Sequence, residues 1–524
     1  MKREKINVPI IIGVAGHRDI TPKDREKLFD TVKMYLSNLI NKYSDTSFVM
    51  LNSLATGADT ICAEAAIELG IEIICPLPFA EEKYEKDFSG DDLLKFKSLI
   101  SRCSKKFVVD PSIQDKERGY SSAGKYIADN CNILIVVWDG IYTNLDRGTS
   151  YTVKEREASN SLRKNLVSAR QVPICHIHVE KSSSNNESTF AIKYLDDKEP
   201  DFEYINTINK DCKTHNLGDG YPALENLDKN NGLFNFDKYY RMTDQLAIVH
   251  QTEYYNLCFV ISFFSIILVF SYLFYDEADI LSMLLIYPIA LVIYYILIKV
   301  TEQLKIYKRF YYYRTLAEML RVQIYLLASG ITENVMRYVS WTRSKEISWI
   351  EDIIISIKTI SNDCKQLSND DIMRDWIENQ LQYHKKSDKM KNKKILVNNT
   401  IVNIMMVLTL LLYGIILIAE YKYSSFLNNE IFNISLRAWC KILWGTFAAA
   451  SLFSTNYFGK FSLERQIEDN RRMQDLYGVA KECFRDTNDN QEKRVLLENL
   501  AKEEINENIE WLSYVSSNTI SFSI

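Results

Sequence analysis

The stretch Val8–Asp19, VPIIIGVAGHRD, decides the fold of the first part of the chain. It is a short, apolar, β-branched run that ends in glycine and charged residues. Two later runs have the same form: Phe48–Leu54 leads into Ala55–Asp59, and Ile133–Val137 leads into WDG at 138–140. Such runs are typical of parallel strands that are covered on both faces. Ligands bind at the carboxyl ends of these strands, so the three loops predict one nucleotide pocket.

Helix signals lie between these runs. Thr21 and Pro22 form an N-cap and a first helical position, and apolar residues then recur every four positions from Leu28 to Ile40. Gly70 has the place of a helix C′ residue. Further strands are expected at 71–77, 107–109 and 171–179. This alternation predicts parallel βαβ units with right-handed crossovers, and therefore an α/β Rossmann-like domain over 1–180.

Composition excludes several classes of protein. The chain has 524 residues, a formal net charge of −5 and ten scattered cysteines without a Cys-x-x-Cys pair. The charge argues against general nucleic-acid binding, and the cysteine pattern indicates a reducing compartment. The first twenty residues show no secretory signal, because the apolar run after Lys5 is too short.

Residues 181–237 are rich in Asn, Asp, Lys, Gly and Ser. We interpret them as a polar linker or surface excursion, with an ordered subdomain as the alternative.

Four dense apolar segments follow and predict membrane spans at about 255–275, 281–300, 402–419 and 439–457. Between and after them the sequence is charged and helical. An all-α transmembrane and cytoplasmic helical region therefore follows the α/β domain. Its predicted parts are a first transmembrane hairpin with a cytoplasmic helix (238–330), cytoplasmic helices (331–400), a second transmembrane hairpin (401–459) and a cytoplasmic helical tail (460–524).

Charge in the loops predicts the orientation. The turn inside the first hairpin carries only acids, whereas basic residues follow the second span, precede the third and follow the fourth. The positive-inside rule places these basic segments, the α/β domain and both termini in the cytoplasm. The fourth span also carries small residues from Gly445 to Ser451. They indicate close helix packing, with a pore-lining face as the alternative.

The three loops supply the candidate ligand-binding residues. Gly16 and Gly57 expose backbone N–H groups at strand ends, Arg18 and Arg147 offer cationic contacts to a phosphate, and Asp139 offers an acceptor to ribose hydroxyls. The full predicted set is Gly16, His17, Arg18, Ser53, Thr56, Gly57, Ala58, Asp59, Phe79, Trp138, Asp139, Gly140, Arg147, Gly148 and Thr149.

Some of these residues also have a structural explanation. Arg18 can pair with a nearby carboxylate, Asp59 can lie in a first helical turn, and Phe79 after Pro-Leu-Pro can pack in the core. Neither a Walker A nor a Gly-x-Gly-x-x-Gly motif is present. The pair His176-x-His178 lacks a nearby partner in sequence, so we expect no metal site and no cofactor.

Several motifs in this order resemble the SLOG superfamily, which relates Smf/DprA proteins to LOG nucleotide hydrolases. They are GVAGHR (13–18), LATGAD (54–59), PLPF (76–79) with Tyr84 and Phe88, GKYIA (124–128), and ILIVVWDG (133–140) with Gly148-Thr149. The helical half resembles SLATT-type transmembrane effectors through Tyr313-Arg314-x-x-Ala317-Glu318-x-Leu320-Arg321. LOG hydrolases place a glutamate three residues after the loop threonine. Here Thr152 has that position, Arg147 replaces the first loop glycine, and Glu155 lies about one turn away.

The resemblance implies a multi-pass effector of the bacterial inner membrane in antiphage defence. Its cytoplasmic domain would bind a nucleotide-derived second messenger, of a cyclic ADP-ribose or cyclic nucleotide kind. Binding would open or disrupt the membrane through a pore-forming homo-oligomer. Thr152 in place of the glutamate favours binding over catalysis. The alternatives are a membrane-bound nucleotide or NAD hydrolase, and a ligand-regulated channel or transporter.

Overall fold

The computed structural model describes residues 7–161, 169–184, 186–195, 197–278, 281–304, 306–423, 425–459 and 463–517. The chain forms two compact units. The first comprises Met1–Pro222, Asn226–Met242 and Met319–Gln366, and the second comprises Ala223–Glu225, Thr243–Glu318 and Leu367–Ile524. The predicted tail 460–524 begins and ends outside the described residues.

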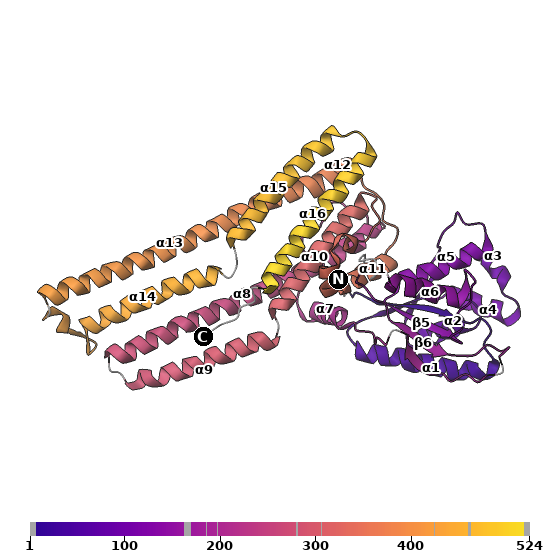
Figure 1. Cartoon of the computed structure of the whole chain (residues 1–524), viewed down its shortest axis with the longest axis horizontal. Helices are drawn as coiled ribbons and strands as arrows, with labels where there is room; N and C mark the ends of the chain where they lie inside the picture. The colour runs from indigo at the N-terminus through magenta and orange to yellow at the C-terminus, as the bar shows by residue number, and fades with distance from the viewer. Residues whose placement is uncertain are drawn as a thin grey trace. The chain divides into compact units, whose positions relative to one another are not determined.

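A seven-stranded sheet lies at the centre of the first unit (Figure 1). Its order is β4-β3-β2-β1-β5-β6-β7, with β7 antiparallel to β6 and the other neighbours parallel. The predicted α/β class with a mainly parallel sheet is confirmed. The strands are β1 (Ile10–Gly16), β2 (Phe48–Leu51), β3 (Glu72–Leu77), β4 (Lys105–Val108), β5 (Ile133–Trp138), β6 (Ile174–His178) and β7 (Ile192–Tyr194).

Helices cover the sheet in two layers. In one layer α1 contacts α2 and α2 contacts α4, and in the other layer α5 contacts α6 (Figure 1). Right-handed crossovers that leave β1 in opposite directions along the sheet place helices on both of its faces. α1 begins at Pro22 as predicted, where Thr21 accepts a hydrogen bond from the Asp24 N–H (3.2 Å). The helices are α1 (Pro22–Lys42), α2 (Ala58–Glu68), α3 (Glu81–Tyr84), α4 (Gly90–Ile100), α5 (Lys116–Asp129) and α6 (Gly148–Ser161).

The predicted linker, 181–237, contains ordered elements of the first unit. β7 extends the sheet, and α7 (Glu203–Thr214) packs beside the start of β1. The buried Asn209 side chain accepts from the Val8 N–H (2.8 Å) and donates to the Val8 carbonyl (2.9 Å). These two bonds satisfy backbone groups just before β1, so the segment completes the fold despite its polar composition.

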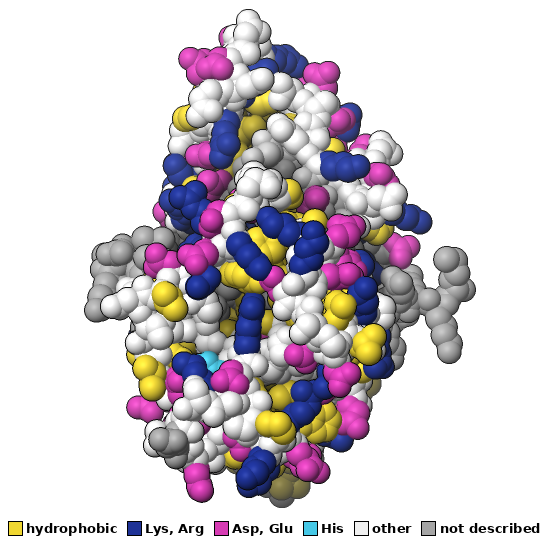
Figure 2. Space-filling model, turned by 90° about the vertical axis from the view of Figure 1, so that its right-hand side faces the viewer, with side chains coloured by type: hydrophobic (Ala, Val, Ile, Leu, Met, Phe, Trp, Pro, Cys, Tyr) yellow, Lys and Arg dark blue, Asp and Glu magenta, His cyan; other side chains and the backbone are white. Residues whose placement is uncertain are grey.

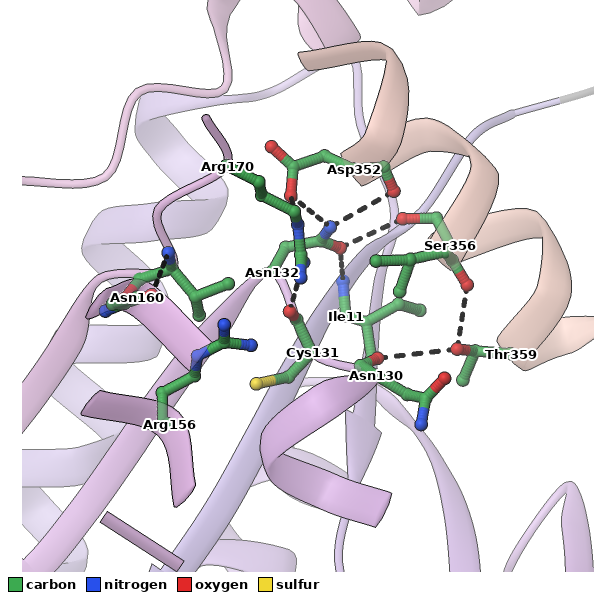
Figure 3. A network of polar contacts seen from close by, with 12 residues as sticks. Ile11, Asn130, Cys131, Asn132, Arg156, Asn160, Arg170, Asp352, Ser356 and Thr359 are labelled. Carbon is green, nitrogen blue, oxygen red and sulfur yellow. Dashed lines mark hydrogen bonds and ion pairs between the residues drawn. The ribbon is translucent and has the colours of Figure 1, made fainter. Parts of the chain in front are cut away.

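Helix α11 (Trp341–Ile360) packs against the amino ends of the strands, about 200 residues from them in sequence (Figure 3). Asn132, just before β5, is the centre of the contact. Its Oδ1 accepts from the Ile11 N–H (2.7 Å) and from Ser356 Oγ (2.9 Å). Its Nδ2 donates to the carbonyl and to Oδ1 of Asp352 (3.2 Å each).

Arg170 extends this network from the segment before β6. Its Nε donates to Asp352 Oδ1 at 2.7 Å, and its Nη2 donates to the Cys131 carbonyl at 2.5 Å. The Arg170 side chain is 5 % exposed. The base of the sheet and α11 therefore share a buried, hydrogen-bonded ion pair, at the end of the strands opposite the predicted ligand loops.

Long helices make up most of the rest of the chain. Three helical segments are long and apolar enough to cross a membrane among the residues that the structure describes: Gly232–Ala278, Leu285–Ala328 and Asn369–Lys422. The predicted fourth span lies within α14, which is not one of the three, so the four-span count and the orientation remain predictions. The helices are α8 (Gly232–Ala278), α9 (Leu281–Leu304), α10 (Ile306–Ala328), α12 (Asn369–Ile372), α13 (Asn379–Lys422), α14 (Leu436–Gly459), α15 (Leu463–Asp486) and α16 (Asn490–Ser517).

Within the second unit, α14 packs closely against α8. A Cβ added to Gly445 would lie 2.5 Å from Leu273 Cδ1, so a larger residue here would force the Leu273 side chain to move. Lys441 pairs with Glu277 (3.0 Å) toward one end of the same contact. The lack of a side chain at Gly445 therefore allows α14 to approach α8 closely, and the pore-lining interpretation stays a prediction.

Candidate functional site

A cavity of about 470 Å³ opens at the carboxyl end of β1. This volume lies within the range of small-molecule sites, roughly 300–1,000 Å³. The loops after β1, β2 and β3 line it together with α5 and the start of α6. The lining residues are Val14, Ala15, Gly16, His17, Arg18, Ser53, Ala55, Asp59, Pro78, Tyr84, Tyr120, Ala123, Gly124, Ile127, Leu145, Arg147, Gly148, Thr149 and Thr152.

The structure brings together about half of the residues predicted from the sequence. Those that line the cavity are Gly16, His17, Arg18, Ser53, Asp59, Arg147, Gly148 and Thr149. Those outside the lining are Thr56, Gly57, Ala58, Phe79, Trp138, Asp139 and Gly140. The residues of the second group therefore do not themselves line the cavity.

Gly57 and Gly16 are needed where two loops touch. Gly57 has a φ of +93°, and a Cβ there would lie 2.3 Å from the Arg18 carbonyl oxygen. A Cβ on Gly16 would lie 2.3 Å from the Ala58 Cβ. The Ala58 N–H donates to the His17 carbonyl (2.9 Å). Glycine thus locks the loop after β1 onto the start of α2, which fixes the position of Arg18.

Two arginines supply positive charge at the exposed rim of the cavity. The Arg18 guanidinium lies 4.7 Å from the centre of the Tyr120 ring, and no carboxylate among the described residues forms an ion pair with it. Arg147 pairs with Glu117 (2.7 Å), and both side chains are exposed. Exposed pairs of this kind are weak, so both arginines are available to an anionic ligand. Figure 2 shows one face of the molecule, on which Lys and Arg side chains gather over hydrophobic ones.

His17 and Asp139 contact each other. Burial lowers the pKa of His17, although Asp139 opposes this shift, so the neutral ring accepts the Asp139 N–H at Nε2 (3.1 Å). Asp139 Oδ1 accepts from the Ile141 N–H (3.0 Å), and Oδ2 pairs with Lys181 (3.1 Å). Burial alone would raise the pKa of Asp139. The Ile141 N–H, Lys181 and His17 outweigh burial, and the pKa lies below its ordinary value. Asp139 therefore orients the loop rather than facing a ribose, which differs from the predicted role.

Phe79 and Trp138 are core residues. Phe79 is 3 % exposed and packs edge-on against Tyr120, with ring centres 5.3 Å apart. Trp138 is 1 % exposed and contacts Tyr142 in the same way. The packing explanation of Phe79 thus holds, and its ring is not placed to stack on a ligand base.

Asp59 and Tyr84 are the buried residues of the described cavity wall that each have a polar atom without a hydrogen-bond partner. Asp59 is 7 % exposed and its Oδ1 has no hydrogen-bond partner in the protein. Tyr84 is 1 % exposed and its hydroxyl has none either. Burial raises the pKa of Asp59 to about 7, while Arg18 opposes the shift. Burial likewise raises the pKa of Tyr84.

Sequence reasoning assigned no ligand role to Tyr84, Tyr120, Gly124 or Thr152. They come from α3, α5 and α6. Tyr84, Gly124 and Thr152 belong to the stretches that resemble SLOG motifs, and this resemblance was the one signal that could have identified them. A Cβ on Gly124 would lie 2.5 Å from Thr152 Oγ1, so these two residues set the approach of α5 to α6.

The chemistry of the lining favours binding. Thr152, in the place of the LOG glutamate, is 4 % exposed and donates to the Gly148 carbonyl (3.3 Å). Glu155 forms an ion pair with Lys125 and does not line the cavity. Asp59 is the only carboxylate in the described lining. The site can hold an anion at the rim, and the two lining side chains with the character of a general acid or base are Asp59 and His17.

Comparison with known proteins adds no family assignment. No family model matches the chain, and no curated protein matches it.

Proposed function

We propose that the chain is a membrane-bound receptor whose α/β domain binds a nucleotide-derived second messenger and whose helices then open or perturb the bilayer. One observation carries the proposal. A nucleotide-sized cavity at the carboxyl edge of a parallel sheet, with Arg18 and Arg147 at its rim, occurs in the same chain as three helical segments able to cross a membrane.

The sequence resemblance to SLOG domains and SLATT-type effectors supports the biological setting. It favours a cyclic ADP-ribose-like or cyclic nucleotide ligand, a homo-oligomer in the bacterial inner membrane, and a role in antiphage defence. A ligand drives such a change only if it binds the two membrane states with different affinity.

Dye release from vesicles tests the proposal. The full chain is reconstituted into phosphatidylethanolamine–phosphatidylglycerol vesicles and exposed to cyclic ADP-ribose, ADP-ribose, cyclic AMP and cyclic GMP. We expect one of these to accelerate release in the wild type and in Arg118→Glu, whose exposed α5 side chain lies outside the cavity lining, but not in Arg18→Glu. Release that needs no nucleotide would instead support a constitutive channel. No release under any condition would contradict the proposal.

A nucleotide or NAD hydrolase is the second candidate, because Asp59 has a carboxyl group with a pKa near 7 in the cavity wall. Incubation of the full chain with NAD and ADP-ribose, followed by chromatography, separates the two functions. Turnover that disappears in Asp59→Asn or in Glu155→Ala would favour the hydrolase.

A further inference from the structure

The cavity has two parts that differ in burial and charge. The rim carries the exposed cations Arg18 and Arg147. The inner wall carries Asp59 and Tyr84, which are both more than nine-tenths buried. Arg18, Asp59 and Tyr84 line the same cavity of about 470 Å³, so the two parts lie within reach of one ligand.

Two buried polar atoms of the inner wall, Asp59 Oδ1 and the Tyr84 hydroxyl, have no hydrogen-bond partner in the protein, although backbone hydrogen bonds from Ala55 and Gly16 act on the Asp59 carboxyl. Buried polar groups are hydrogen-bonded in most native proteins, and each exception calls for an explanation. Other polar side chains of the same loops are satisfied internally. Ser53 donates to the Pro76 carbonyl (2.8 Å), and Asn52 donates to the Asp59 carbonyl (2.8 Å). Asp59 Oδ1 and the Tyr84 hydroxyl are the exceptions in this wall.

We propose that Asp59 and Tyr84 form a specificity subsite, which recognises an uncharged hydrogen-bonding group of the ligand while the rim arginines hold its phosphate. The group is a nucleobase N–H or a ribose O–H, since a carboxyl oxygen and a phenol together offer an acceptor and a donor. This inference rests on the proposed function and narrows it. The ligand is a nucleotide that is recognised both at its phosphate and at its base or ribose, not a simple phosphate.

The state of Asp59 fits an uncharged partner. Burial raises its pKa to about 7, so this carboxyl takes on negative charge less readily than an exposed aspartate does, and repulsion of a nearby phosphate is reduced. A site built to hydrogen-bond a ligand group also rejects analogues that lack the group, because its own buried atoms would then remain unpaired.

Calorimetry with two probes tests the subsite on the full chain in detergent. Pyrophosphate carries only the charge, whereas ADP-ribose adds a base and ribose hydroxyls. We expect Tyr84→Phe and Asp59→Ala each to weaken ADP-ribose binding by roughly tenfold and to leave pyrophosphate binding unchanged. Arg18→Glu should weaken both probes.

Stability provides the second readout. Tyr84→Phe removes a hydroxyl that has no partner in the protein, so its thermal midpoint should equal or exceed that of the wild type. A lower midpoint would show that the hydroxyl serves the fold and would overturn the inference.

The outcomes separate the inference from the proposed function. Wild-type protein that binds neither probe would overturn the subsite, and failure to bind cyclic ADP-ribose, cyclic AMP and cyclic GMP as well would overturn the proposed function. Wild-type protein that binds ADP-ribose with an affinity unchanged in Tyr84→Phe and Asp59→Ala would overturn the subsite alone. To distinguish base from ribose recognition, ribose 5-phosphate replaces ADP-ribose: sensitivity to Tyr84→Phe that persists with this probe assigns the subsite to a ribose hydroxyl.

Discussion

Asp352→Ala should loosen α11 from the base of the sheet. The change removes the carboxylate that accepts from Arg170 Nε (2.7 Å) and from Asn132 Nδ2 (3.2 Å). Arg170 is 5 % exposed and would retain the Cys131 carbonyl as a hydrogen-bond partner. Removing one partner of a buried ion pair costs roughly 3–5 kcal/mol because the remaining charge is left uncompensated.

The lower end of that range applies here. The Asp352 side chain is 20 % exposed, and Glu351 also contributes a favourable charge to Arg170. We therefore expect about 3 kcal/mol, which corresponds to an increase of roughly 100-fold in the population with α11 open.

Hydrogen exchange measured by mass spectrometry on the full chain in detergent provides the assay. Peptides within 341–360 and around Asn132 should exchange faster in Asp352→Ala. Glu68→Ala is the control, because it breaks the exposed Lys33–Glu68 pair (2.8 Å) and should cost at most about 1 kcal/mol. Unchanged exchange in α11, or an equal effect of the control, would refute the assignment of this ion pair as a main contact of α11.

Three further predictions concern the loops, the cavity wall and the helices. Gly57→Ala should lower stability by at least about 1 kcal/mol, because φ is +93° and the new Cβ would meet the Arg18 carbonyl. Thermal unfolding measures this, and Gly478→Ala within α15, where no atom lies near the added Cβ, should show no loss. Asp59→Asn should become more stable relative to the wild type as the pH rises from 5 to 7. The folded-state pKa, about 7, lies above the ordinary 3.8, so the folded chain binds the proton more tightly and loses stability on deprotonation, by at most roughly 1.4 kcal/mol per pH unit. Equal pH dependence of the two proteins would contradict the burial of this carboxyl. Gly445→Leu should lower the thermal midpoint in detergent, because its Cβ would lie 2.5 Å from Leu273 Cδ1, whereas Gly414→Leu, with open space around its Cβ, should not.

The strands and the ligand loops were predictable because their signals are local. A β-branched run that ends in Gly16 or in Gly57 marks both the strand and the turn after it. Residues immediately after parallel strands share one edge of the sheet, which is why Arg18, Ser53 and Arg147 converge on the cavity.

The inner wall was not predictable in the same way. Tyr84 lies on α3 and Tyr120 on α5, and their place in the cavity depends on how the crossovers pack. Phe79 and Tyr84 are both almost fully buried, but only Tyr84 lines the cavity. Only the packed structure distinguishes a buried aromatic residue from one that lines a cavity.

Sequence patterns also could not predict where α11 packs. Asp352 and Ser356 are four apart and therefore share one face of the helix, but the pattern does not say what that face contacts. Its partner is Asn132, more than 200 residues earlier. The α7 segment is a similar case, because Asn209 stabilises the start of β1 from within a polar stretch.

Equilibrium dialysis of labelled ADP-ribose and cyclic ADP-ribose against the full chain in detergent tests the central claim most directly. We expect saturable binding of at least one of them, at one site per chain. In Arg18→Glu this binding should weaken by roughly 10- to 100-fold, the value of a charge-assisted phosphate contact, whereas Arg118→Glu should bind as the wild type does. Absence of saturable binding, or equal weakening in the two variants, would contradict the claim that this cavity is the nucleotide site.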